Sequence, residues 1–219
     1  MLTYNLINKN IPQLKLQDSI AKALQLISDY RVTHLPVVVN KIFLGLISEE
    51  DLLDAEDDKL PIEILQNYFL KAAVQNNVHF LNAINHSIQF DTTIIPIVQQ
   101  DEFIGVITSP DLLKTLGNFA GANEIGGLIV LEMERFQFAI SEISRIVESN
   151  DCTILHLNTT VAEHTGLLTV TLHLNKREIA AILAAFERYD YTIIYSFGNE
   201  KFENALHVNY NNLMHYLDI

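Results

Sequence analysis

A hydroxyl side chain and a carboxylate stand three residues apart at two places in this chain, in Ser48-x-x-Asp51 and in Thr108-x-x-Asp111. A serine or threonine hydroxyl can donate a hydrogen bond to a phosphate oxygen. An aspartate is better suited to accept hydrogen bonds from the two hydroxyls of a ribose. The residue types therefore indicate two places where a ligand with phosphate and ribose groups could bind.

The same spacing is also that of a capping box, in which a hydroxyl at the N-cap and a carboxylate three residues later satisfy free N–H groups of a helix. A strand that runs into such a helix start leaves N–H groups and the positive end of the helix dipole pointing at one spot, which suits a phosphate. The sequence alone leaves both the capping interpretation and the binding interpretation open.

Both pairs belong to a stretch that recurs after sixty residues, as Gly45–Asp51 and Gly105–Asp111. In the first copy, Asp18 and Ser19 can cap a helix with apolar positions at helical spacing. A strand at 35–39, a turn at 40–41, a second strand at 42–47 and a helix from 48 follow. The second copy repeats this order, and a short helix opening on Pro61 is expected between the copies. Because one copy cannot cover its apolar sheet face alone, we expect the two to pack about a pseudo-twofold axis in one domain.

The apolar-Pro-Val-Val strand, the Gly-apolar-apolar-Ser/Thr-x-x-Asp turn and their recurrence resemble a pair of CBS motifs, a Bateman module, over residues 1 to 116. The resemblance implies a regulatory module that binds AMP, ADP, ATP or S-adenosylmethionine in its clefts. It places Asp51 and Asp111 on ribose hydroxyls, and Ser48 and Thr108 near phosphate.

The family often has a basic residue just before the Leu-Pro strand. His34 holds this position in the first copy and Ile94 holds it in the second, so the two clefts should differ.

The chain changes character after residue 116, since four of its eight glycines fall within 117–127 and no proline follows Pro110. Apolar periodicity then predicts strands at 127–133, 153–158, 168–174 and 191–196 and helices near 139–147 and 179–186. This βαββαβ order is ferredoxin-like and resembles an ACT domain, in an arrangement similar to acetoin-utilisation-type CBS-ACT proteins. ACT domains that bind amino acids usually have a glycine in the first turn, and 134–137 has none, so we expect sheet-to-sheet dimerisation there instead of effector binding.

Composition excludes several other classes of protein. The 219 residues carry a net charge of −13, which disfavours nucleic acid and anionic membranes as partners. The single cysteine, Cys152, allows no internal disulfide, and no long apolar segment predicts a membrane span, so we expect a cytoplasmic protein. Dispersed histidines and the absence of hydrolase, zincin, Walker or Rossmann motifs predict no metal and no catalysis.

The sequence thus predicts a mixed α+β or α/β chain: a CBS pair at 1–116 (motifs at about 1–56 and 60–116), a linker at 117–126, an ACT-like domain at 127–198 and a terminal helix at 199–219. The expected function is that of a homodimeric ligand sensor that acts on an unknown effector protein. A scaffold or oligomerisation module with vestigial clefts is the alternative. The ligand residues would be His34, Ser48, Asp51, Thr108 and Asp111.

Overall fold

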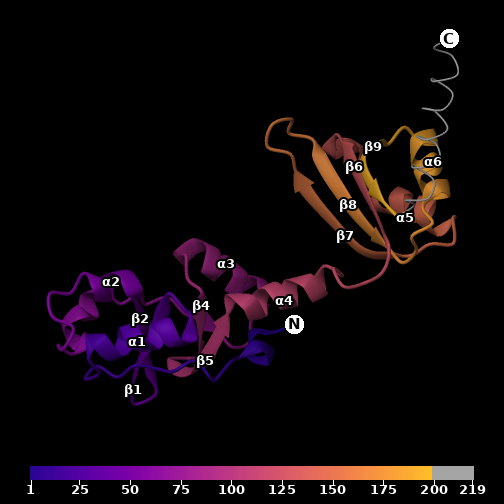
Figure 1. The fold of residues 1–219 in the computed structure, drawn as a ribbon. Helices are drawn as coiled ribbons and strands as arrows, with labels where there is room; N and C mark the ends of the chain where they lie inside the picture. Colours follow the sequence, from indigo (N-terminus) through magenta and orange to yellow (C-terminus); the bar gives the residue numbers. More distant parts are fainter. Residues whose placement is uncertain (199–219) are drawn as a thin grey trace, which may run out of the picture. The chain divides into compact units, whose positions relative to one another are not determined.

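The computed structural model describes residues 1–198 and divides the chain into two compact units, Met1–Leu116 and a second that begins at Gly117 (Figure 1). Each unit is described by itself below. The predicted terminal helix at 199–219 lies outside the described residues.

The first unit contains two copies of one arrangement of helices and strands. Its elements, in chain order, are η1 (Thr3–Leu6), α1 (Ile20–Tyr30), β1 (His34–Val39), β2 (Ile42–Ser48), α2 (Glu49–Leu53), η2 (Ile62–Tyr68), β3 (Val74–Gln75), α3 (Leu81–Phe90), β4 (Ile94–Gln99), β5 (Glu102–Thr108) and α4 (Ser109–Phe119).

Two hairpins of equal register form most of the five-stranded sheet, whose order is β1-β2-β5-β4-β3. His34 pairs with Ser48 in the first hairpin as Ile94 pairs with Thr108 in the second, and both hairpins shift register at the same place. The first turn, Asn40-Lys41, has positive φ at both residues, as a two-residue hairpin with the twist of the strands requires. The predicted tandem repeat is therefore confirmed strand by strand.

The two hairpins join at the centre of the sheet, where Ile42 of β2 pairs with Glu102 of β5. The N–H of Phe103 donates to the carbonyl of Lys41 at 2.7 Å, and the equivalent N–H of Phe43 donates to the Asp101 carbonyl at 3.3 Å. The rings of Phe43 and Phe103 stack, with centroids 6.1 Å apart. These reciprocal contacts confirm the pseudo-twofold relation between the copies.

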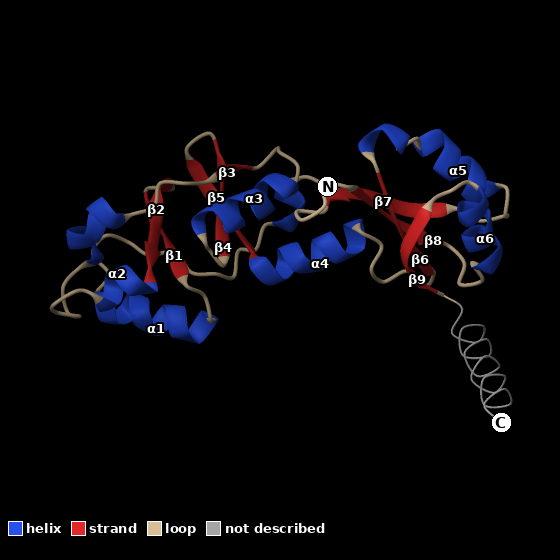
Figure 2. Cartoon of the chain, turned by 90° about the horizontal axis from the view of Figure 1, so that it is seen from above, coloured by secondary structure: helices blue, strands red, loops and turns tan. Residues whose placement is uncertain are grey.

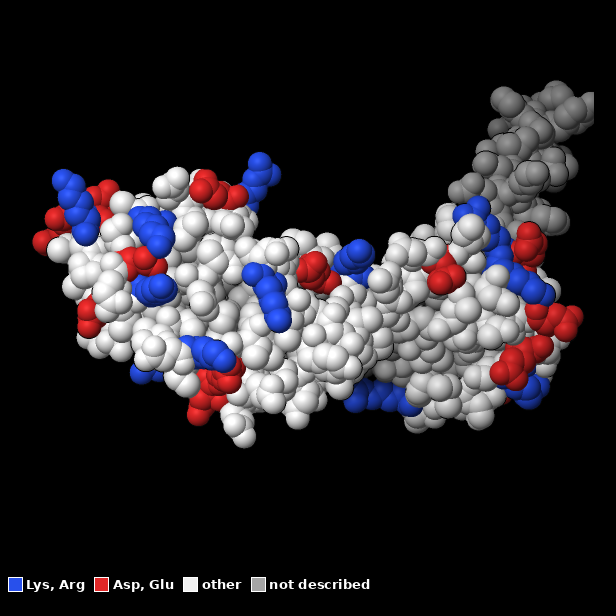
Figure 3. Space-filling model, turned by 90° about the horizontal axis from the view of Figure 1, so that it is seen from below, with Lys and Arg blue, Asp and Glu red and all other residues white. Residues whose placement is uncertain are grey.

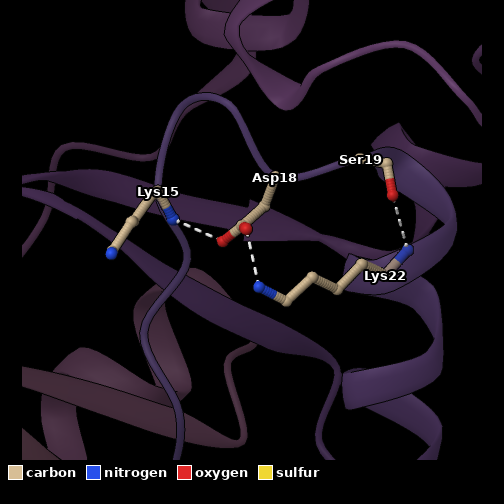
Figure 4. Close-up of polar contacts among 4 residues, drawn as sticks. All are labelled: Lys15, Asp18, Ser19 and Lys22. Atoms are coloured by element: carbon tan, nitrogen blue, oxygen red, sulfur yellow. Dashed lines mark hydrogen bonds and ion pairs between the residues drawn. The ribbon is translucent and has the colours of Figure 1, made fainter.

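Helix α1 begins where the sequence places its cap, and Figure 4 shows the contacts. The Lys22 N–H donates to Ser19 Oγ at 3.2 Å, while the Asp18 carboxylate accepts from the Lys15 N–H at 2.8 Å and from Lys22 Nζ at 2.6 Å. Burial alone would raise the pKa of Asp18, but these hydrogen bonds and the two lysine charges outweigh it and lower the pKa. Asp18 thus ties the preceding loop to the first turn of the helix.

The glycine of each repeated stretch is required by a close approach of backbone. Gly45 has φ +153° and Gly105 has φ +147°, a region that side chains with a Cβ rarely adopt. A Cβ at Gly45 would lie 2.7 Å from Phe69 Cβ, and one at Gly105 would lie 2.5 Å from Ile7 Cγ2. Each hairpin therefore has room at this point for a crossing segment of chain.

The segment that crosses each hairpin at its glycine comes from a different part of the chain: Phe69 and Leu70 cross the first hairpin, and Ile7 and Asn8 cross the second. Leu70 exchanges hydrogen bonds with Leu46 of the first copy, both at 2.9 Å, so the segment between the copies packs on the first. Asn8 forms the equivalent pair with Val106 of the second copy, and Thr3 donates its N–H to the Val78 carbonyl at 2.9 Å. The chain's first eight residues consequently belong, by contact, to the second copy.

Local geometry differs from the sequence prediction at three points. The segment after Pro61 is a 3-10 helix at Ile62–Tyr68, with Pro61 at its N-cap and not at its first helical position. Helix α2 has only five residues. Helix α4 extends to Phe119, so it contains Gly117 and the first residues of the expected linker.

The second unit has the predicted βαββαβ order. Its elements are β6 (Gly127–Met133), η3 (Arg135–Gln137), α5 (Ile140–Glu148), β7 (Ile154–Val161), β8 (Leu168–Leu174), α6 (Ala180–Arg188) and β9 (Thr192–Phe197). The strands form one antiparallel sheet in the order β7-β8-β6-β9, with α5 and α6 side by side against it (Figures 1 and 2).

Alternation along the strands explains which face of this sheet the helices cover. Ile129 and Leu131 of β6 and Leu172 of β8 are buried, and they share a core with Ile143 of α5 and Phe186 of α6. The ferredoxin-like fold expected from the sequence is confirmed. Strands β7 and β9 form the two edges of the sheet.

Candidate functional site

Ser48 and Asp51 contact each other at the start of α2. The Asp51 N–H donates to Ser48 Oγ at 3.0 Å, and the Ser48 hydroxyl donates to Asp51 Oδ2 at 2.5 Å. In a capping box the carboxylate would instead accept from the backbone N–H of the cap residue, so the predicted box forms in part only. Within the residues that the structure describes, no donor contacts the other carboxylate oxygen, Asp51 Oδ1.

Thr108 and Asp111 repeat this arrangement at the start of α4. The Asp111 N–H donates to Thr108 Oγ1 at 3.3 Å, and the Thr108 hydroxyl donates to Asp111 Oδ2 at 2.6 Å. The Thr115 hydroxyl donates to the Asp111 carbonyl at 2.7 Å one turn later. The two hydroxyls therefore already have partners, and each would offer a ligand its remaining lone pair or an exchanged hydrogen bond.

The copies meet beside His34 through two threonines that were not among the predicted ligand residues. The Thr33 N–H donates to Thr93 Oγ1 at 2.9 Å, and the two hydroxyl oxygens are 3.0 Å apart. Thr33 Oγ1 is also 2.8 Å from His34 Nδ1. Their recurrence at the sixty-residue offset was the available sequence signal for a contact on the pseudo-twofold axis.

His34 is half-buried, and burial lowers its pKa, although Asp51 and Asp91 act in the opposite direction. The imidazole is therefore mainly neutral at pH 7, with one ring nitrogen engaged by Thr33. A neutral ring can form hydrogen bonds with a ligand, but it does not supply the positive charge that the family position suggests.

A cleft of about 670 Å³ brings three of the five predicted residues together, namely His34, Ser48 and Asp51. It also takes residues from the end of α3 in the second copy. The lining residues are Thr33, His34, Ser48, Glu49, Glu50, Asp51, Leu53, Asp54, Phe90 and Asp91. Thr108 and Asp111 do not line this cleft, because they occupy the equivalent positions of the other copy.

The second copy differs at the position of His34, as the sequence indicates. Ile94 is 0% exposed and belongs to an apolar core that contains Leu35 of the first copy and Val106 of the second. An imidazole at this position would lose its water without a hydrogen-bond partner. The two copies thus differ at this position, with an imidazole lining the cleft of the first copy and a buried apolar side chain at the equivalent place in the second.

The second unit has a cleft of its own beside the turn that lacks glycine. This cleft of about 450 Å³ is bordered by Glu134 and Gln137, where the Glu134 N–H donates to Gln137 Oε1 at 2.9 Å, and by Glu142 and Tyr191. The Tyr191 hydroxyl donates to Glu142 Oε2 at 3.0 Å. Burial and this carboxylate raise the pKa of Tyr191 to about 12.

Three further features concern residues 1 to 198 only. No group of three or more His, Cys, Asp or Glu side chains in that range could hold a metal ion. Cys152 is buried and its Sγ donates to Asn175 Oδ1 at 3.2 Å. No helix in the described part of the chain is long and apolar enough to cross a membrane.

Comparison with known families agrees with the fold of the first unit. Residues 4–58 match the family model for the CBS domain. The second copy repeats the same hairpin register, helix order and capping pair, so the first unit has the fold of a CBS pair. The second unit has the element order and strand order of a ferredoxin-like βαββαβ fold.

Three solved structures are similar to part of the chain. A CBS domain pair/ACT domain protein from Thermotoga maritima is 18% identical over 54% of this chain and 98% of its own, with a TM-score of 0.49. A protein assigned to acetoin utilization from Vibrio cholerae is 18% identical over 56% of this chain and 95% of its own, with a TM-score of 0.47. CBSX2, solved in complex with AMP, is 18% identical over 54% of this chain and 97% of its own, with a TM-score of 0.44.

Proposed function

We propose that the chain is a regulatory sensor that binds an adenosine-containing ligand in the clefts of its CBS pair. The observation that carries this proposal is the cleft of about 670 Å³ in which His34, Ser48 and Asp51 of one copy face residues of the other copy. Its volume lies within the range of small-molecule sites in proteins. Most of its lining residues are polar or charged, and Leu53 and Phe90 add apolar surface.

Each side chain has a role that follows from its contacts. Asp51 Oδ1 would accept hydrogen bonds from ribose hydroxyls, since Oδ2 already binds Ser48. Phe90 and Leu53 would supply apolar surface to a purine. Thr108 and Asp111 would take the same roles in the second copy, where the hydroxyl and carboxylate have the same geometry.

A ligand in the first cleft would touch both copies, because Asp51 comes from one and Phe90 from the other. The copies are held together nearby by the Thr33–Thr93 hydrogen bonds. A ligand that binds better at one angle between the copies would shift the population toward that angle, whereas equal affinity for all angles would shift nothing. This change is the signal that the sensor would transmit.

The second unit would mediate dimerisation or pass on this signal. Edge strand β9 exposes apolar side chains, with Ile194 50% and Tyr195 52% exposed. Pairing of two such edges would satisfy their free backbone groups and cover this surface. Light scattering should then give a dimer, and Ile194→Lys should shift it toward monomer. A wild-type chain that stays monomeric at high concentration would refute this role.

Calorimetry and thermal shift with AMP, ADP, ATP, S-adenosylmethionine and NADH test the sensor directly. Ligand that binds only the folded chain raises its stability by mass action, so saturation should raise the melting temperature. Asp51→Ala and Asp111→Ala should each remove binding at one cleft. If no compound stabilises the wild-type chain, the sensor proposal is wrong. If a compound still binds after both substitutions, the ligand site lies elsewhere.

A scaffold module with vestigial clefts is the second candidate. It is favoured by one observation, the mutual satisfaction of Ser48 with Asp51 and of Thr108 with Asp111, which explains these residues as helix caps without a ligand. The scaffold predicts an intact dimer with no response to any compound of the panel. The sensor predicts an intact dimer that is stabilised by at least one of these compounds.

A further inference from the structure

The acidic lining of the first cleft has no counterpart at the equivalent positions of the second copy. Five carboxylates line the first cleft, and among its described lining residues there is no lysine or arginine. These carboxylates belong to Glu49, Glu50, Asp51, Asp54 and Asp91. With a mainly neutral His34, the formal charge of this lining is −5.

The repeat gives the equivalent residues of the second copy, which would line a second cleft. Sixty residues later in the chain, Glu49, Glu50, Asp51 and Asp54 correspond to Ser109, Pro110, Asp111 and Lys114. Sixty residues earlier, Asp91 corresponds to Arg31. One carboxylate and two cations remain, so the formal charge is +1.

Backbone contacts show that these positions are equivalent in space and not only in sequence. The Glu49 N–H donates to the Thr33 carbonyl at 2.9 Å, and the Ser109 N–H donates to the Thr93 carbonyl at 2.9 Å. Arg31 and Asp91, which end α1 and α3, both have the left-handed conformation, with φ of 53° and 48°. Arg31 should therefore border the second cleft as Asp91 borders the first.

Helix stabilisation does not account for the acidic lining. Glu49, Glu50 and Asp51 lie in the first turn of α2, where carboxylates are favourable. Asp54 and Asp91, however, are the C-caps of α2 and α3, where a negative charge opposes the helix dipole. Asp54 and Asp91 share a position in the lining of the first cleft.

The two cations of the second cleft are not neutralised within the described residues. Arg31 and Lys114 are exposed, and neither forms an ion pair between residues 1 and 198. Lys41, by contrast, pairs with Glu102 at 3.1 Å. The contrast between the clefts is local, since acidic and basic side chains are interspersed on the face shown in Figure 3.

We propose that the clefts select ligands by charge: the first admits a neutral or cationic adenosine compound and rejects phosphate, and a phosphate-bearing nucleotide enters the second. The proposal rests on the proposed function, which it refines by assigning a ligand class to each cleft. It narrows the expectation from the family resemblance, which placed both Ser48 and Thr108 near phosphate. Each nearby charge should change the affinity for a phosphate group by about threefold to tenfold.

Calorimetry with adenosine and AMP on the full chain tests the assignment, since the two differ only in the phosphate. Arg31→Gln/Lys114→Gln should lower the ratio of AMP affinity to adenosine affinity about tenfold or more. Glu50→Gln/Asp54→Asn should raise that ratio and let AMP occupy a further site. Lys71→Gln, a charge change in the loop before β3, serves as control and should leave the ratio unchanged. Salt should weaken AMP binding and spare adenosine.

The outcomes separate this proposal from the sensor itself. Loss of AMP binding in Asp111→Ala but not in Asp51→Ala supports the assignment. If Asp51→Ala abolishes AMP binding, or if the Arg31 and Lys114 variant keeps the wild-type ratio, the assignment is wrong although the chain is still a sensor. If neither adenosine nor AMP nor any other compound of the panel binds, the sensor and the assignment both fail.

Discussion

Replacing Gly45 by alanine should destabilise the first unit severely, although alanine adds only one methyl group. The positive φ of +153° costs about 1–3 kcal/mol for a residue with a Cβ. The new Cβ would also lie 2.7 Å from Phe69 Cβ and 3.1 Å from the Leu70 carbonyl oxygen, and overpacking of this kind costs about 1–3 kcal/mol. We therefore expect a loss of about 3 kcal/mol or more, a large part of the stability of an ordinary domain.

Two further glycines serve as controls for Gly45→Ala. Gly105→Ala, at the equivalent position of the repeat, should be comparably severe, because its Cβ would lie 2.5 Å from Cγ2 of the stiff Ile7 side chain and 3.0 Å from the Asn8 carbonyl oxygen. Gly117→Ala should stabilise by about 0.5–1 kcal/mol, since Gly117 is helical and its Cβ would meet only Ala122 Cβ at 3.9 Å.

Urea unfolding followed by circular dichroism measures all three variants, since the chain has no tryptophan for fluorescence. The free energy is extrapolated to water, and the midpoints are compared at equal slope. A Gly45→Ala protein within 0.5 kcal/mol of wild type, or one more stable than Gly117→Ala, would show that Phe69 does not pack against this hairpin as described.

Three other substitutions test contacts of both units. Asp18→Asn should lower the unfolding free energy by about 1 kcal/mol at pH 7. Because folding lowers the pKa of Asp18, the difference from wild type should shrink as the pH falls below 3.8. An unchanged difference in acid would refute the pairing with Lys22. Tyr191→Phe should lower the unfolding free energy by about 1 kcal/mol below pH 10. Because folding raises the pKa of Tyr191, wild type should lose this extra stability between pH 10 and about 12. A constant difference in alkaline urea titrations would contradict the hydrogen bond to Glu142. Thr93→Val removes both hydrogen bonds to the first copy and should cost about 1 kcal/mol in the same assay, whereas a neutral effect would mean that water replaces them.

Much of this fold could be predicted from the sequence because its signals are local. The pairs Ser48–Asp51 and Thr108–Asp111, the hairpin turns and the alternating strand at 168–174 depend on residues that are close in the chain. The offset of sixty residues then fixed how the two copies pair, since two equal hairpins satisfy each other by symmetry.

What the sequence did not reveal depends on contacts between distant segments. Nothing local indicates that Asp91 borders the cleft of the other copy, or that Arg31 takes its equivalent place. The position of His34 suggested a cation, but burial and the Thr33 contact favour a neutral ring. The sequence also did not predict that the helix after Pro61 has 3-10 geometry, because so short a helix has no distinct apolar period.

The exchanged crossing segments have a consequence for the order in which the chain can fold as it leaves the ribosome. Asn8 is made early, but its partner Val106 lies near the end of the first unit. Until that residue emerges, Asn8 has no backbone partner in the second hairpin, while the first hairpin can already pair with Leu70. During synthesis, the first copy should therefore fold almost completely before the second. In the last step of folding, the first residues of the unit pair with residues near its end.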